Sequence, residues 1–357
     1  MPRATVARID LDALKFNYHL AQAKAGSTQA MAVVKADGYG HGIQAVAKAL
    51  ANDARKFAVA CLEEAFAIRA AGLHQPVVML QGVHRPEDLE LCFQQGFEPV
   101  LHNSQQLQWL AASSAPLYWL KVNTGMNRLG FRPSELPAVM AKLEEGGQRA
   151  ELQGFVTHFA CADDTSSPMT AEQTRIFEQA TQAWPKLMRS VGNSAAHFLP
   201  EQPLYDWSRP GIMLYGASPM IGKTGSDLGL KPVMTLEAPL ITTRTVKPGE
   251  SIGYGSTWVA ESETRMGMVA IGYGDGYPRH AGTGTPAAVL GQRIGLLGRV
   301  SMDMLAVDLT GMPEAQEGDM VELWGKTVSV DEVAACAGTI GYELLTGVTA
   351  RVPRDCY

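Results

Sequence analysis

Short apolar runs recur through the first two-thirds of the chain, and most are flanked by glycine, proline or asparagine. Such runs predict buried strands. Their uninterrupted apolar character is typical of a parallel sheet that is covered on both faces. The predicted strands cover residues 31–34, 57–60, 77–80, 97–101, 117–122, 152–157 and 212–215.

Apolar residues at helical spacing lie between these runs. One such face is formed by Leu14, Tyr18 and Ala21, and Gly26 is the expected stop signal for that helix. Thr170 and Gln173 predict a capping box at the start of a later helix. Further helical faces are expected at 43–50, at 62–69 before a glycine, and at 176–180.

This alternation of strand and helix favours a (β/α)8 TIM-type barrel. A doubly wound open sheet has the same alternation, and the pattern alone does not separate the two.

The pattern changes after about residue 225. Glycine and proline recur at short intervals, and the runs between them are rich in β-forming residues, at 240–246, 266–271 and 320–324. One short helix is expected at 330–337. We therefore predict a barrel domain over 9–225 and a mostly β domain over 226–357.

Composition narrows the classes of partner. The net charge of −6 is mild and no block of like charges occurs, so we expect no nucleic acid and no anionic membrane as partners. No apolar run approaches the roughly 18 residues of a membrane span, and the N-terminus leads into no signal-peptide segment. The five cysteines form no C-x-x-C pair, so neither a disulfide framework nor a metal site is expected. A cytoplasmic location is the interpretation that fits.

Lys35 is the first candidate for chemistry. It ends the run 31–34 and precedes Ala-Asp-Gly-Tyr-Gly-His-Gly at 36–42. In a barrel this is the carboxyl end of a strand, where catalytic residues lie. A lysine in a partly desolvated pocket has its neutral amine favoured, which Schiff-base chemistry requires. Taken alone, Lys35 also fits an ordinary lysine that reaches solvent from a strand end.

Longer sequence segments around Lys35 and other polar residues resemble segments of one family, the alanine racemases. The segment Val-Val-Lys-Ala-Asp-Gly-Tyr-Gly-His-Gly at 33–42 is similar to the lysine motif that binds pyridoxal phosphate (PLP) in that family. The resemblance continues in the family's order over nearly the whole chain. The matching segments are 121–130, 157–160, 193–196, 209–216, 253–255, 272–276, 298–303 and 351–354.

The resemblance implies an isomerase that interconverts L- and D-alanine. It also implies a PLP-binding barrel followed by a β domain, to which residues up to about 8 add a strand. Lys35 would hold PLP as a Schiff base and act as the base on one face of the substrate. Tyr254 would act on the other face, with His158 as its partner. Without the family match, Tyr254 fits a structural tyrosine in a glycine-rich turn.

Three further charged residues receive roles from the same resemblance. Arg209 would face the pyridine nitrogen and, because arginine keeps its proton, would donate a hydrogen bond to it. Arg128 would reach the phenolic oxygen of PLP and the substrate carboxylate. Lys121 matches a lysine that is often carbamylated in the family, and the alternative is an ordinary strand lysine.

The phosphate and the substrate complete the implied site. Ser194, Gly211, Ile212 and the Tyr39 hydroxyl would bind the phosphate in the loops after the last two barrel strands. The substrate-binding residues from the β domain would be Tyr273, Met302 and Asp303. In the family the β domain residues come from the neighbouring subunit, which implies a homodimer with shared active sites. The implied role is D-alanine biosynthesis for peptidoglycan precursors, with D-amino-acid catabolism as the alternative.

Three positions depart from the family pattern. Ala350 stands where we expect a tyrosine beside the phosphate, which would widen substrate choice. Asn123 stands where aspartate is frequent, which puts the charge balance around Lys121 in doubt, and Asp37-Gly38 should have little effect. The rival functions are a broad-specificity serine or lysine racemase, a PLP-dependent decarboxylase of the same fold, and a non-enzymatic PLP carrier.

Overall fold

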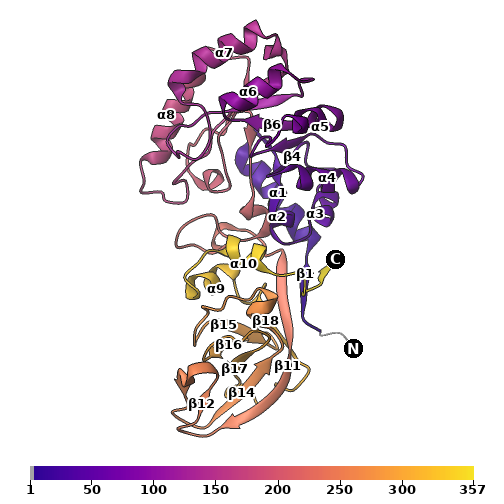
Figure 1. The fold of residues 1–357 in the computed structure, drawn as a ribbon. Coiled ribbons are helices and arrows are strands. Elements are labelled where there is room, and N and C mark those ends of the chain that lie inside the picture. The colour runs from indigo at the N-terminus through magenta and orange to yellow at the C-terminus, as the bar shows by residue number, and fades with distance from the viewer. Residues whose placement is uncertain (1–3) are drawn as a thin grey trace.

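The computed structural model describes residues 4–357, and these residues form two parts that lie one above the other (Figure 1). The first part contains a parallel sheet in which each strand pairs with the next along the chain. Its strands are β3 (Ala32–Val33), β4 (Phe57–Val59), β5 (Val77–Met79), β6 (Phe97–Leu101), β7 (Tyr118–Lys121), β8 (Leu152–Val156) and β9 (Met188–Ser190).

Hydrogen bonds at the two edges close this sheet into a barrel. Strand β10 (Trp207–Ser208) pairs in parallel with β2 (Gln29–Ala30), which directly precedes β3. Beyond the paired residues, the Val33 amide donates to the Pro210 carbonyl at 3.1 Å. On the other side the Arg209 amide donates to the Gly192 carbonyl at 2.8 Å. The predicted TIM-type barrel is thereby confirmed, and the open sheet is excluded.

Helices surround the barrel as the apolar pattern predicts. The face of Leu14, Tyr18 and Ala21 is buried in the first helix, which ends before Gly26. Apolar side chains fill the barrel core, and one buried ion pair joins Lys56 and Glu98 there, with 2.5 Å between Nζ and Oε1. The helices are α1 (Leu11–Ala25), α3 (Ile43–Ala49), α4 (Leu62–Ala70), α5 (Glu87–Gln95), α6 (Ser104–Ala111), α7 (Leu136–Glu145) and α8 (Met169–Thr181), with short 3-10 turns between some of them.

The second part is a mostly β domain, as predicted. The long strand β11 (Met234–Val246) pairs with β14 and with β18, so the sheet closes on itself. Strand β1 (Val6–Ile9) joins this sheet beside β11, and residues 1–3 of the predicted N-terminal strand lie outside the described range. The other strands are β12 (Ser251–Ile252), β13 (Trp258–Val259), β14 (Thr264–Val269), β15 (Pro286–Val289), β16 (Gln292–Leu297), β17 (Leu305–Asp308), β18 (Met320–Trp324) and β19 (Arg354–Cys356).

Two short helices of the second part lie against the barrel (Figure 1). The predicted helix at 330–337 is observed as α9 (Val330–Cys336), whose capping box is formed by Ser329 and Glu332. The second helix, α10 (Gly341–Gly347), follows at once and contacts the segment after Lys35. Its N-cap is Ile340, so no polar cap in the sequence signals its start.

Two predictions about local structure are wrong. Residues 212–215 are fully buried but form the 3-10 turn η4 (Ile212–Tyr215), because an apolar run does not by itself separate a strand from a buried helical turn. Thr170 and Gln173 form no capping box, since α8 begins at Met169 and its N-cap residue, Pro168, makes no side-chain cap. In residues 4–357, no helix combines the length and apolar character needed to cross a membrane.

Candidate active site

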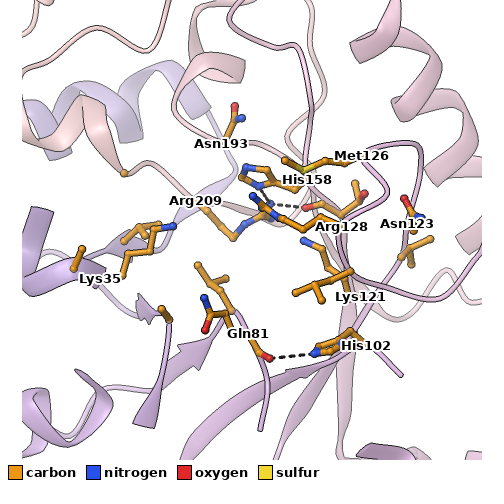
Figure 2. A pocket seen from close by; sticks show the side chains of 18 of the residues that line it. Lys35, Gln81, His102, Lys121, Asn123, Met126, Arg128, His158, Asn193 and Arg209 are labelled. Atoms are coloured by element: carbon orange, nitrogen blue, oxygen red, sulfur yellow. Dashed lines mark hydrogen bonds between the residues drawn. The ribbon is translucent and has the colours of Figure 1, made fainter. Parts of the chain in front are cut away.

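A cavity of about 1130 Å³ lies at the carboxyl ends of the barrel strands, where the second part meets the barrel. The predicted residues from the barrel lie together in its wall, although they come from six different loops and strands (Figure 2). They are Lys35, Tyr39, Lys121, Arg128, His158, Ser194, Arg209, Gly211 and Ile212.

Lys35 directly follows the first barrel strand and points into this cavity (Figure 2). Burial lowers the pKa of its amine, and the positive charge of Arg128 lowers it further, while Glu64 opposes the change. This environment favours the neutral amine that attacks carbonyl carbon, which is the form that Schiff-base chemistry requires.

Arg209 forms the floor of the cavity and is 4% exposed. Its guanidinium donates to the Ser190 hydroxyl and to the Thr157 carbonyl, both at 2.5 Å. It also lies 3.4 Å from Nδ1 of His158. Burial lowers the pKa of Arg209 to about 10, so it stays protonated at neutral pH. It is therefore a fixed donor of hydrogen bonds.

His158 is neutral in this arrangement. Because Arg209 can only donate, Nδ1 of His158 must accept and carries no proton. The pKa of His158 lies well below its ordinary value, first because the ring is desolvated and then because Lys121, Arg209, Arg128 and Lys35 are nearby cations.

Gln173 holds the loop that carries His158. Its Oε1 accepts from the Ala160 amide at 2.8 Å, and its Nε2 donates to the His158 carbonyl at 2.9 Å and to the Thr124 hydroxyl at 3.1 Å. The side chain is fully buried in α8. The sequence singled out Gln173 as part of a predicted capping box. Its hydrogen bonds to two loops, however, depend on tertiary packing.

Lys121 ends strand β7 beside these cations. Its pKa is lowered well below the ordinary lysine value, by desolvation and then by Arg209, Arg128 and Lys35. Among the described lining residues Glu343 is the one carboxylate, so the cavity carries a clear excess of positive groups. Such a wall fits a ligand that carries several negative oxygens.

Arg128 lies in the loop after β7, and the neighbouring Asn123 shapes that loop. Oδ1 of Asn123 accepts from the amides of Gly125 at 3.1 Å and Asn127 at 3.0 Å. An aspartate would accept the same two bonds, so the departure at this position preserves the loop and removes one negative charge from it.

The loops that carry Ser194 and Gly211 meet in the cavity wall. The Ser194 hydroxyl accepts from the Gly211 amide at 2.8 Å, at the start of η4. A side chain at Gly211 would collide, because a Cβ there would lie 2.4 Å from the Tyr39 hydroxyl. The Tyr39 hydroxyl therefore lies close to the backbone of Gly211. A site for a small anion requires donor groups gathered in this way.

The predicted residues of the β domain do not line this cavity. Tyr254 is 72% exposed, in the turn η6 (Tyr254–Ser256). Tyr273 lies in another turn, η7 (Tyr273–Asp275), beside the loop of Met302, since the Gly274 amide donates to the Met302 carbonyl at 2.8 Å. Asp303 accepts from Arg351 at 2.8 Å. Within one chain, these residues form an exposed surface away from Lys35.

The interpretation of position 350 is wrong. Ala350 is exposed and does not line the cavity. A tyrosine does lie in the wall, and it is Tyr342 of α10, whose ring centroid is 6.2 Å from that of Tyr39. A missing tyrosine at position 350 therefore does not widen this cavity. Ile340, Glu343 and Thr346 of the same segment also line the cavity, and no sequence motif pointed to them.

Comparisons with known proteins show which family this chain resembles over most of its length. Residues 9–219 match the family model described as "Alanine racemase, N-terminal domain", and residues 233–356 match "Alanine racemase, C-terminal domain". Alanine racemase from Marinobacter nauticus is 73% identical over 99% of both chains.

Solved structures of alanine racemases have the same fold as this chain. The biosynthetic alanine racemase from Pseudomonas aeruginosa superposes with a TM-score of 0.94 at 47% identity, over 100% of both chains. The alanine racemase from Bartonella henselae with covalently bound pyridoxal phosphate gives a TM-score of 0.90 at 30% identity, again over 100% of both chains.

Proposed function

Because this chain belongs to the alanine racemase family and is an isomerase, we propose that it interconverts L- and D-alanine with PLP bound covalently through Lys35. The observation that carries the proposal is the cation-lined cavity around Lys35, whose pKa is lowered by burial and by Arg128. The structure with covalently bound pyridoxal phosphate among its structural relatives supports the same cofactor.

The residues present fit PLP at both ends of the cavity. Ser194, Gly211, Ile212 and the Tyr39 hydroxyl would bind its phosphate, because they meet at the cavity wall and a glycine at 211 lets the Tyr39 hydroxyl approach the backbone. Arg209 would donate a hydrogen bond to the ring nitrogen, and Arg128 would bind the phenolic oxygen and the substrate carboxylate. When bound, PLP makes the α-proton of the amino acid acidic by delocalising the electron pair that remains on the α-carbon.

Two residues would move the proton. The freed amine Nζ of Lys35 takes or gives the α-proton on one face of the substrate, since its lowered pKa favours the neutral form. On the other face, we assign this role to the hydroxyl of Tyr254 of the partner subunit. In the described chain Tyr254 is exposed and outside the cavity, which fits a residue that serves a second subunit. Its predicted relay partner is His158.

The dimer follows from the same assignment. Tyr273, Met302 and Asp303 share the exposed surface with Tyr254, and we propose that this surface covers the cavity of the partner and contacts the substrate there. We keep 9–225 and 226–357 as the proposed domain boundaries.

For Lys121 we propose carbamylation. The amine lies among Arg209, Arg128 and Lys35, all of which favour its neutral form. Addition of carbon dioxide to this neutral amine, with release of one proton, forms a carbamate anion among these cations. We also propose a cytoplasmic location, because all five cysteines are free thiols, and a role in D-alanine biosynthesis for peptidoglycan precursors.

Loss of optical activity on separate samples of L-alanine, L-serine and L-lysine tests the function with purified, PLP-loaded protein. We expect rapid racemisation of alanine and much slower reaction of the other two. Comparable rates on serine or lysine would replace the alanine assignment by a broad-specificity racemase.

The Lys35→Ala variant should lack the visible absorbance of covalently bound PLP, and normal absorbance in that variant would overturn the lysine assignment.

A further inference from the structure

The five residues after Lys35 form a left-handed turn. Their φ angles are +52° at Ala36, +53° at Asp37, +62° at Gly38, +51° at Tyr39 and +81° at Gly40. L-residues other than glycine avoid this region because Cβ approaches the following carbonyl oxygen. Three of the five are not glycine, so contacts from outside the turn must hold it in place.

Two carboxylates hydrogen-bond to the segment, Glu64 from outside the turn and Asp37 from within it. Oε1 of Glu64 accepts from the Ala36 amide at 2.7 Å, and Oδ1 of Asp37 accepts from the Ile43 amide at 2.8 Å. The first bond holds the start of the turn, and the second ties the turn to the first residue of α3. Backbone amides donate to the carbonyls of Ala36, Asp37 and Gly38, whereas the Tyr39 carbonyl is met by a side-chain donor.

His41 is a buried side chain that donates to two of those carbonyls. Its Nδ1 lies 3.1 Å from the Gly38 oxygen and 2.9 Å from the Tyr39 oxygen. Because both neighbours are acceptors, Nδ1 must carry the proton, and the ring is the Nδ1–H tautomer. The ring is fully buried and lies outside the cavity wall.

The same imidazole also packs against Tyr215, whose ring stacks on Tyr39. The rings of His41 and Tyr215 have centroids 4.7 Å apart, and the rings of Tyr39 and Tyr215 stack with centroids 4.7 Å apart. The Tyr215 hydroxyl donates to the Val33 carbonyl, two residues before Lys35. His41 therefore contacts the carbonyls of the turn and the ring that supports Tyr39, but neither Lys35 nor the reacting atoms.

We propose that His41 is a positioning residue, whose Nδ1–H bonds to Gly38 and Tyr39 hold the left-handed turn and so place Lys35 and the Tyr39 hydroxyl for the cofactor. The link to PLP rests on the proposed function. The link to the turn rests on the described contacts alone.

A matched pair of variants tests the proposal. Asparagine and leucine have nearly the same shape, but only asparagine places an N–H near the position of Nδ1. We expect His41→Leu to accelerate amide hydrogen exchange at residues 36–40 of the PLP-free protein. We expect the same variant to weaken PLP binding by roughly 10- to 100-fold, because the Tyr39 carbonyl loses its donor and the Gly38 carbonyl keeps only backbone donors. His41→Asn should keep both properties within about threefold of the wild type.

Thr181→Val is the control for loss of a buried hydrogen bond elsewhere. Its hydroxyl is buried in α8 and donates to the Phe177 carbonyl at 2.8 Å. This variant should lower the melting temperature without changing exchange at 36–40 or PLP affinity. Normal exchange and normal PLP affinity in His41→Leu would overturn the proposal, and so would equal damage in His41→Asn and His41→Leu.

A second measurement avoids the risk that His41→Leu does not fold. In the wild type, nitrogen NMR of labelled histidine should show His41 as the Nδ1–H tautomer at neutral pH, and the Nε2–H tautomer would overturn the proposal. If the wild type takes up no PLP at Lys35, the proposed function fails, while the exchange and NMR results still decide the role of His41.

Discussion

Two lysines in one cavity differ in what surrounds them. Lys35 has Arg128 and the carboxylate Glu64 as its charged neighbours, which act in opposite directions on its pKa. Lys121 has only cations among the charged groups that shift its pKa. At the residue scale, this difference makes Lys35 a nucleophile that is still able to carry a proton, whereas Lys121 is disfavoured as a cation.

Covalent PLP uptake by Lys35 should depend on pH. Because its pKa is lowered, the neutral amine should be present at lower pH than for an ordinary lysine with a pKa of 10.5. The rate of covalent PLP uptake by the cofactor-free protein should therefore rise with pH and level off below 10.5. Stopped-flow absorbance over a pH series measures this rate.

The control for this titration is Lys35→Ala. Its remaining surface lysines should react slowly, and their rate should keep rising toward the ordinary lysine pKa. A wild-type rate that levels off only near that ordinary value would contradict the lowered pKa.

At the scale of elements, the site depends on where loops meet. The turn after β3 carries Tyr39, and the loop after β10 carries Gly211, so that segments far apart in the chain lie in contact. A second close approach joins the barrel to the other part of the molecule, because a Cβ at Gly40 would lie 2.1 Å from the Leu345 carbonyl oxygen of α10. Glycine at these two positions permits loop contacts that define the cavity wall.

Substitution at Gly211 tests this contact. In Gly211→Ala the new methyl group must displace the Tyr39 hydroxyl, since the two would lie 2.4 Å apart. Overpacking of this kind costs about 1–3 kcal/mol, so we expect PLP affinity to fall by roughly 5- to 150-fold. Titration of the cofactor-free protein with PLP, followed by absorbance, measures the change.

Gly282→Ala is the matched control, because a Cβ there meets no atom within 4 Å and its φ is not in the left-handed region. That variant should bind PLP like the wild type. An unchanged PLP affinity in Gly211→Ala would show that Tyr39 and Gly211 do not form the phosphate cradle.

At the scale of the whole molecule, the barrel supplies a cavity and the β domain supplies an exposed surface elsewhere. Tyr254 and Met302 are 72% and 53% exposed on that surface. A surface that presents apolar and aromatic side chains in this way is typical of an interface. In a two-fold dimer, each surface can cover the cavity of the other subunit.

Mixed dimers test this arrangement. Lys35→Ala and Tyr254→Phe should each be nearly inactive as homodimers. A mixed dimer should contain one site with both residues intact, made from Lys35 of one subunit and Tyr254 of the partner subunit. Random assembly of equal amounts should therefore restore roughly a quarter of the wild-type activity.

Co-expression with two different affinity tags allows the mixed dimer to be isolated and assayed. Each homodimer, purified in the same way, is the control for background activity. An isolated mixed dimer without activity would contradict the shared site.

The amino-acid sequence determined the strand and helix pattern of the barrel and the residues that carry charge into its wall. Strands at 57–59 and 97–101 and the helix at 11–25 were predictable, because burial of an apolar face is a local periodic property. Two separate segments that match the family likewise pointed to Lys35 and to Arg209 before their place in one cavity wall was known.

The tertiary structure alone decided which of these residues meet. It showed that 212–215 is a buried 3-10 turn, that Gln173 ties loops instead of capping a helix, and that Tyr342 lies in the wall where Ala350 was expected to leave a gap. It also showed the left-handed turn held by His41. These features depend on distances between segments that are remote in sequence, and neighbouring residues do not encode such distances in their periodicity.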